Sequence, residues 1–332
     1  MLIFYIIASF PPALYAMEAA GSDREYSIIA PLASKSLLLD AVSTGEVMFT
    51  VGERGHILKS TDGIHWVQQV VPTRVTLTAV FFLDSLKGWA VGHDATILRT
   101  IDGGEHWELV FESPDDEAPL LDIWFRNGQE GIAIGAYGLY LVSDDGGKNW
   151  QRSELKILDD TKEEITDDRT NDFIEDYDLH LNRIDSNQVG RLYIVAEAGR
   201  IFMSRDNGST WHRLPSPYEG SLFGLLPLTE DSLLIFGLRG HLFRSDDGGY
   251  HWEAIETNTR EMLTDAVMTN EGEIYICGLG GALVISRDQG KTFNTEYSKN
   301  RHSYTALLTD RNNSIMAVGD AGIIPVSEMN FK

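Results

Sequence analysis

The side chains best suited to chemistry in this sequence are a set of arginines and a pair of aspartates. Four arginines could converge on one face and clamp a carboxylate with their paired N–H donors; these are Arg54, Arg183, Arg239 and Arg301. Asp40 and Asp265 occupy comparable positions in two repeats of the chain, and paired carboxylates are the catalytic groups of many glycosidases. The competing interpretation, which we favour, is that both aspartates are ordinary polar residues near the start of a strand.

Six further aspartates recur inside one motif, S-x-D-x-G-x-x-W, whose first copy is one residue shorter. The Asp and aromatic residues of the six copies are Asp62 and Trp66, Asp102 and Trp107, Asp145 and Trp150, Asp206 and Trp211, Asp247 and Trp252, and Asp288 and Phe293. Gly after Asp or Asn supplies the positive φ of a tight turn, and the Asp carboxylate can accept hydrogen bonds from backbone N–H groups of that turn. The aromatic side chain can then be buried on the next strand. We interpret the motif as a structural hairpin corner.

A second signature, apolar-Gly-x-x-Gly-x-apolar, precedes each corner. Its first Gly stands at positions 52, 92, 135, 237, 278 and 319, with Ala at 196, so successive copies are 40, 43, 61, 41, 41 and 41 residues apart. A period near 41 is the length of a four-stranded propeller blade.

The chain is therefore predicted to form an all-β, seven-bladed propeller over residues 26–327. In the second unit we expect strands at 77–82, 89–91, 96–99 and 107–111, because short β-branched and aromatic runs alternate there with Gly and Asp. The seventh unit stops after its third strand. We expect residues 26–29 to supply its missing outer strand and so close the ring without an exposed sheet edge.

Two segments fall outside this repeat. Residues 1–20 are apolar and are predicted to be a signal peptide, with an uncleaved membrane anchor as the alternative. The long step of 61 residues contains an acidic insertion, residues 151–183, between blades three and four. It is either a solvated loop or an acidic arm for a basic partner.

Composition excludes several classes of function. The net charge of −23 argues against nucleic acid and against an anionic membrane surface as partners. The nine histidines are scattered and show no metal-ligand spacing, so we expect neither a metal nor a cofactor. The single cysteine, Cys277, is expected to be a small buried side chain without a disulfide partner.

Propeller topology predicts where a partner would bind. The Gly-x-x-Gly loops join the second and third strands of each blade, so they share a face with the connections between blades. Their variable residues sit on a constant glycine frame, which is where binding residues are commonly found. The candidate partner-binding residues are Glu53, Arg54, His93, Asp94, Tyr137, Glu197, Arg239 and Asp320.

The repeated unit G-x-x-G-x-[I/L]-x-x-[ST]-x-D-x-G-x-x-W resembles the photosystem II stability/assembly factor family and its relatives in non-photosynthetic bacteria. Its corner alone is the Asp-box, or bacterial neuraminidase repeat. The resemblance covers about residues 26–327. It implies a seven-bladed propeller that is exported to the lumen or periplasm and is not an enzyme.

The family's photosynthetic members assist the assembly of a membrane complex by binding a partner protein, and they use an arginine-rich patch. The resemblance thus implies a monomeric scaffold for a membrane-associated protein complex. Residues just before the corners are basic in three of six copies, namely Lys59, Arg99 and Arg244. The alternative is a carbohydrate-binding or sialidase-like glycoside hydrolase, although the Arg-Ile-Pro signature of sialidases is absent.

Overall fold

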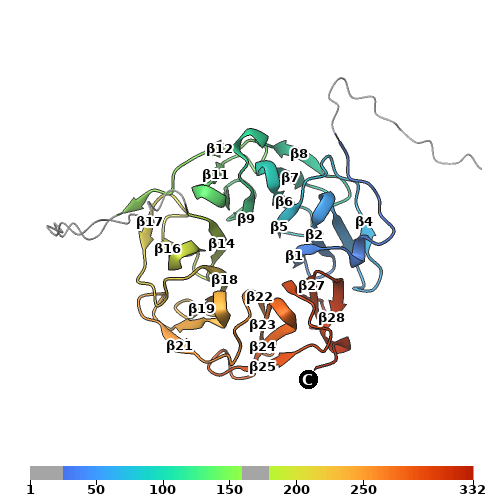
Figure 1. Cartoon of the computed structure of the whole chain (residues 1–332). Coiled ribbons are helices and arrows are strands. Elements are labelled where there is room, and N and C mark those ends of the chain that lie inside the picture. The colour runs from blue at the N-terminus through green and yellow to red at the C-terminus, as the bar shows by residue number, and fades with distance from the viewer. Residues whose placement is uncertain (1–24, 159–178, 332) are drawn as a thin grey trace, which may run out of the picture.

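The computed structural model describes residues 25–158 and 179–331. Seven sheets, antiparallel except for one added strand in blade four, are arranged as blades around a central opening (Figure 1). The first strands of the seven blades, which we call strand A, line this opening. They are β1 (Leu38–Ser43), β5 (Leu77–Phe82), β9 (Leu120–Phe125), β14 (Leu181–Ser186), β18 (Leu222–Pro227), β22 (Leu263–Met268) and β26 (Tyr304–Thr309). The predicted seven-bladed, four-stranded β-propeller is therefore confirmed.

The second strand of each blade is the most apolar element, because it is covered on both faces by neighbouring blades. These strands are β2 (Met48–Gly52), β6 (Gly88–Gly92), β10 (Gly131–Gly135), β15 (Leu192–Ala196), β19 (Leu233–Gly237), β23 (Ile274–Gly278) and β27 (Ile315–Gly319). The third strands are β3 (Ile57–Ser60), β7 (Ile97–Thr100), β11 (Tyr140–Ser143), β16 (Ile201–Ser204), β20 (Leu242–Ser245), β24 (Ala282–Ser286) and β28 (Gly322–Pro325).

Outer strands complete the first six blades. They are β4 (Val67–Gln68), β8 (Glu108–Phe111), β12 (Gln151–Arg152), β17 (Trp211–Arg213), β21 (Glu253–Ile255) and β25 (Asn294–Tyr297). Short 3-10 turns connect the strands: η1 (Ala33–Lys35), η2 (Glu53–Gly55), η3 (His93–Ala95), η4 (Pro114–Asp116), η5 (Ala136–Gly138), η6 (Glu197–Gly199), η7 (Leu238–Gly240), η8 (Leu279–Gly281) and η9 (Val326–Glu328). The described residues include no α-helix.

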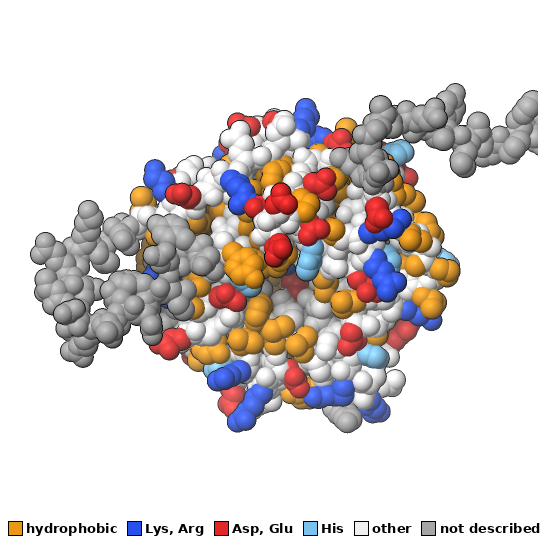
Figure 2. Space-filling model, turned by 45° about the horizontal axis from the view of Figure 1, so that its top comes forward, with side chains coloured by type: hydrophobic (Ala, Val, Ile, Leu, Met, Phe, Trp, Pro, Cys, Tyr) orange, Lys and Arg blue, Asp and Glu red, His pale blue; other side chains and the backbone are white. Residues whose placement is uncertain are grey.

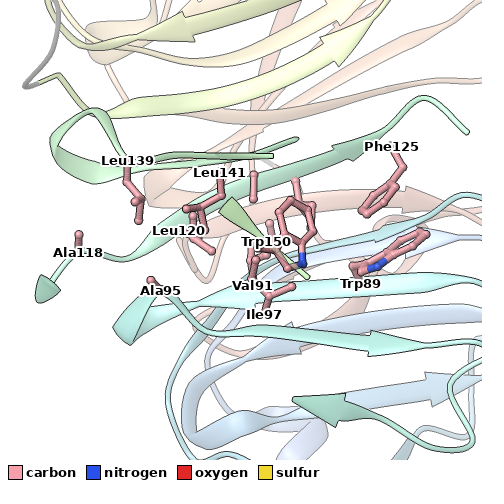
Figure 3. Close-up of a cluster of buried hydrophobic side chains, with 13 residues drawn as sticks. Trp89, Val91, Ala95, Ile97, Ala118, Leu120, Phe125, Leu139, Leu141 and Trp150 are labelled. Carbon is pink, nitrogen blue, oxygen red and sulfur yellow. The ribbon is translucent and has the colours of Figure 1, made fainter. Parts of the chain in front are cut away.

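Large side chains fill the space between adjacent blades. Between blades two and three, Trp89 stacks on Phe125 with ring centroids 3.6 Å apart, and Trp150 meets Phe125 edge-on at 5.7 Å (Figure 3). The Asp corner of blade three passes directly against the ring of Trp89 in this cluster. Gly147 has φ +73°, and a Cβ there would lie 2.3 Å from Nε1 of Trp89, so the corner requires glycine at this point.

The seventh blade differs from the prediction. Residues 26–29 do not pair with it, and among the described residues its sheet has three strands, β26, β27 and β28. The N-terminal segment instead runs along blade one, where the N–H of Ser27 donates to the carbonyl of Val71 at 2.9 Å. The side-chain amide of Gln68 holds the same segment, because it accepts the N–H of Ala30 at 2.8 Å and donates to the carbonyl of Ile28 at 3.0 Å. These hydrogen bonds to the outer strand of blade one account for the position of the segment.

The described ends of the acidic insertion belong to neighbouring sheets. Gln151–Arg152 form β12, and residues 181–183 lie in β14. Ile157–Leu158 form β13, which pairs in parallel with β17 as a fifth strand of blade four. Residues 159–178 of the insertion, like the predicted signal peptide 1–20, lie outside the described residues.

Candidate functional site

The Gly-x-x-Gly loops of the first six blades share an unusual backbone conformation. Each forms a 3-10 turn whose middle residue is left-handed, with φ between +51° and +60°. These residues are Arg54, Asp94, Tyr137, Ala198, Arg239 and Gly280. A non-glycine residue pays a conformational cost there, on the order of 1 kcal/mol. Glycine occupies this position in the sixth blade, whereas the other five loops carry a side chain there at that cost.

Backbone hydrogen bonds fix these loops to the connections between blades. The N–H of Gly55 donates to Val75, that of Ala95 to Ala118 and that of Gly138 to Leu179, each at 2.8–3.1 Å. The acceptors all lie in connections that lead to the next strand A. The loops and these connections therefore form one face of the ring, here called the loop face, with a rigid frame under its side chains. The hollow at the centre of the ring has acidic and hydrophobic side chains around it (Figure 2).

Two predicted binding residues come together between blades three and four. Tyr137 is 60% exposed, and its ring meets that of His180 edge-on at 5.0 Å. Nδ1 of His180 lies 3.4 Å from a carboxylate oxygen of Glu197. His180 was not predicted, and its only sequence signal is its place in the connection that follows the acidic insertion.

Arg239 lines an open pocket of about 800 Å³ on blade five. The pocket is bounded by η7, with His241 directly after it, and by the connection that follows β21, which contributes Glu256 and Arg260. Arg260 was not predicted either, because it lies in a connection with no repeated motif. Two guanidinium groups give this part of an otherwise acidic chain a local positive charge.

The remaining candidates occupy three other blades. Arg54 and Glu53 are side by side, with Nε and Oε2 4.0 Å apart. Oδ1 of Asp320 lies 3.0 Å from Nδ1 of His302, on blade seven. The side chains of His93 and Asp94 lie on η3 of blade two. The structure thus places the predicted residues around one face but does not gather them into a single pocket, and their role as partner contacts stays a prediction.

The Asp corners lie at the opposite ends of the strands. In blade three, Oδ1 of Asp145 accepts the N–H groups of Lys148 and Asn149, both at 3.0 Å. Hydrogen bonds from the Asn149 side chain and backbone lower the pKa of Asp145 to about 2. The carboxylates of the corners are thus occupied by their own turns. Trp107, Trp150, Trp211 and Phe293 are buried, whereas Trp66 and Trp252 are half-buried.

A second cluster occupies the central opening, at the third residue of strand A. This position holds Asp40, Ala79, Asp122, Arg183, Gly224, Asp265 and Ala306 in blades one to seven. The guanidinium group of Arg183 lies 4.0 Å from Asp40, 3.5 Å from Asp122 and 3.4 Å from Asp265. Sequence comparison found Asp40, Arg183 and Asp265 but missed Asp122. Aligning the third residue of each strand A would have found it.

The same aspartates tie adjacent blades together. Oδ2 of Asp40 accepts the N–H of Val80 in blade two, that of Asp122 accepts the N–H of Ile184 in blade four, and that of Asp265 accepts the N–H of Leu307 in blade seven. The second residue of strand A forms further hydrogen bonds between neighbouring blades. Oγ1 of Thr78, Thr264 and Thr305 donates to the first carbonyl of the next blade's strand A, at 2.5–3.0 Å.

Burial dominates the electrostatics of this cluster. It raises the pKa of Asp40 to about 7 and that of Asp185 to about 6, although Arg183 pulls both downward. Burial also raises the pKa of Asp122. Burial disfavours the charged guanidinium, but Asp122, Asp265 and Asp40 more than compensate and hold the pKa of Arg183 above its usual range. The single arginine is therefore the counter-ion of several buried carboxyls.

The arrangement does not assemble the arginine clamp considered from the sequence. Arg183 is surrounded by carboxylates, whereas Arg54 pairs with Glu53 and Arg301 pairs with Glu261 at 2.9 Å. Within residues 25–158 and 179–331, no three His, Cys, Asp or Glu side chains are placed to share a metal ion. The described part of the chain also has no helix of sufficient length and apolarity to cross a bilayer.

Comparison with known proteins finds a family match for part of the chain. Residues 58–161 match the family described as "Photosynthesis system II assembly factor YCF48", which confirms the predicted resemblance for that part of the chain. A search of curated proteins found no match to this sequence.

Solved structures with the same fold include two YCF48 propellers. One, described as "YCF48 bound to D1 peptide", has a TM-score of 0.67 and 19% identity, covering 92% of this chain and 96% of that one. YCF48 from Cyanidioschyzon merolae has a TM-score of 0.64 and 15% identity, covering 90% and 97%. A streptogramin B lyase has a TM-score of 0.69 and 11% identity, covering 90% and 95%. At these identities the likeness establishes the fold alone, which is shared by binding proteins and enzymes.

Proposed function

We propose that this chain is a non-catalytic, exported scaffold that binds a protein partner through the loop face and assists a membrane-associated complex. The observation that carries the proposal is the loop face itself. Five of its six left-handed loop positions hold side chains other than glycine, on a frame fixed by backbone hydrogen bonds. A loop backbone that is already fixed loses little conformational entropy on binding, which suits a recognition surface.

The wide distribution of the candidate residues over the loop face favours a protein as the ligand. The candidate contacts belong to loops of several blades, around a ring rather than in one enclosed pocket. They include an exposed tyrosine beside a histidine and a pair of arginines, and aromatic and arginine residues dominate the energetics of protein interfaces. The family match over residues 58–161 supports the same ligand class, because one YCF48 structure is described as bound to a D1 peptide.

The rival proposal of a sialidase-like hydrolase has less support. Such chemistry needs a free arginine cluster to clamp a carboxylate ligand. Arg183 already faces three carboxylates at 3.4–4.0 Å, so its positive charge is neutralised within the protein. Asp40 and Asp265 each accept a backbone N–H of the neighbouring blade, which accounts for their presence without catalysis.

Site-specific photo-crosslinking in the native envelope tests the proposal. A photoreactive residue is placed at Tyr137 or Arg239 on the loop face and, as a matched control, at the exposed His106 on the corner face. We expect the first two positions to capture the same protein, identified by mass spectrometry, and the control position not to capture it. Purified partner should then lose at least about tenfold in affinity for the R239E/R260E variant.

Two results would count against this function. Equal capture from His106 would mean that the loop face is not the binding surface. Glycan hydrolysis by the purified chain, without capture of a protein, would favour the hydrolase. A variant that lacks residues 158–176 tests the acidic insertion separately, because loss of capture only in that variant would assign the partner contact to the acidic arm.

A further inference from the structure

The pocket on blade five is formed where two segments of the chain touch. Arg239 belongs to η7, and Arg260 belongs to the connection that follows β21. These two segments are in close contact, because a Cβ on Gly240 would lie 2.3 Å from the carbonyl oxygen of Thr259. Each arginine is the chain neighbour of one of these two contacting residues, and both arginine side chains are exposed. The contact therefore presents two guanidinium groups to one pocket of about 800 Å³.

Hydrogen bonds hold both segments in place. Oγ1 of Thr257, in the connection, donates to the carbonyl of Gly240 in η7 at 2.8 Å. The outer strand of blade six, β25, adds two more bonds. Oγ1 of Thr295 donates to the carbonyl of Thr257, and the hydroxyl of Tyr297 donates at 2.8 Å to Oγ1 of Thr259. The backbone beneath the two arginines is thus fixed before a ligand arrives, which lowers the entropic cost of binding.

Neither guanidinium group is used within the described structure. Ten arginines of the described residues form ion pairs with carboxylates, in a chain that has 50 acidic residues. Arg239 and Arg260 form neither an ion pair nor a hydrogen bond within residues 25–158 and 179–331. Glu261 is the acid next to Arg260 in sequence, and it is already paired with Arg301 at 2.9 Å. The N–H donors of both guanidinium groups therefore remain open to a ligand.

We propose that this pocket binds a carboxylate of the partner protein; the inference rests on the proposed function for the partner and adds the chemistry of the contact. A planar guanidinium presents paired N–H donors that match the two oxygens of a carboxylate. Glu256 also lines the pocket, so with histidine counted as neutral the two arginines and one acid leave a net charge of +1. One carboxylate neutralises that charge. A run of phosphates would exceed it and would be repelled by the net charge of −23 on the chain.

Protection of the full chain from phenylglyoxal, which modifies open guanidinium groups, tests the proposal without any partner protein. The probe is a short peptide of Glu and Ser with both ends capped, and the control peptide has Gln in place of Glu. At a peptide concentration about twice the dissociation constant, the Glu peptide should slow modification of Arg239 and Arg260 about threefold, as followed by mass spectrometry. Arg311 is the internal control, because it is exposed on blade seven and has no ion pair among the described residues. Its rate should not change.

Fluorescence anisotropy of the labelled Glu peptide compares the variants. R239Q/R260Q should bind it at least about tenfold more weakly than the wild type, and R311Q should bind it equally well. A Gln peptide with a free carboxyl terminus identifies the source of the carboxylate, because protection by this peptide alone assigns a chain terminus rather than an acidic side chain.

Three results would overturn the proposal: equal protection of Arg311, stronger protection by inorganic phosphate than by either carboxylate peptide, or no protection at all. Capture of a protein by a photoreactive residue at position 239, without protection by either peptide, would refute the carboxylate and leave the proposed function standing.

Discussion

Replacement of Arg183 by methionine isolates the electrostatic role of the central cluster. The guanidinium lies 3.4–4.0 Å from three buried aspartates, so each pair gains about 4–5 kcal/mol of Coulomb energy at an effective dielectric constant near 20. Desolvation and repulsion between the carboxylates offset most of that sum. Removal of one partner from a buried ionic network costs about 3–5 kcal/mol, and we expect R183M to lose that much stability at pH 8.

The loss of stability in R183M should depend on pH in a definite direction. Asp40 and Asp185 have pKa values raised to about 7 and about 6, so at pH 5.5 much of the negative charge that Arg183 compensates is already gone. The stability deficit of R183M should therefore shrink at pH 5.5, to roughly half its value at pH 8. Urea denaturation of the wild type and of R183M at the two pH values measures this difference in stability.

R126M is the matched control, because Arg126 forms an exposed ion pair with Glu130 at 3.0 Å. We expect it to change stability by less than about 1 kcal/mol at either pH. The reasoning is refuted if R183M costs less than about 1 kcal/mol at pH 8, or if its deficit grows as the solution is acidified.

The structure makes three further predictions. Folding raises the pKa of Asp40 from 3.8 to about 7, so the protonated carboxyl stabilises the folded state fully at low pH. This contribution should be lost as the pH rises from about 4 to about 7 and should be level above that, and D40N should weaken the fall in urea titrations. T305V removes the 2.8 Å hydrogen bond to Leu38 that joins blade seven to blade one, and should cost about 1 kcal/mol in the same assay; no change would mean that the bond contributes nothing to ring closure. G92A should lower the melting temperature, with a cost of about 1–3 kcal/mol, because its Cβ would lie 2.2 Å from the carbonyl oxygen of Thr76, whereas an unchanged melt would show that the backbone can yield there.

Most of the fold could be read from local sequence. The Gly-x-x-Gly loop and the Asp corner are short-range devices, and residues within four positions of Asp145 supply all of its hydrogen bonds. The spacing between successive motifs predicted the length of a blade, and the number of Gly-x-x-Gly loops predicted the number of blades. The loop-face residues could be predicted for the same reason, since topology alone decides which connections share a face.

Ring closure could not be read in the same way. The spacing of residues 26–29 relative to Leu38 matched that of an outer strand, yet this segment bonds to Gln68 and Val71. Sequence periodicity measures distance along the chain, and it carries no information on which blade the segment hydrogen-bonds to.

The sequence by itself determined the blade, the number of blades and the face that presents variable loops, because each depends on contacts within about 40 residues. Only the tertiary structure decided what meets at the centre. Asp40, Asp122, Arg183 and Asp265 come from four blades, and they are brought within ion-pair distance solely because the ring closes. A local motif determines the conformation of its own turn. A contact across the central opening depends instead on the twist and packing of every blade that lies between the two residues in contact.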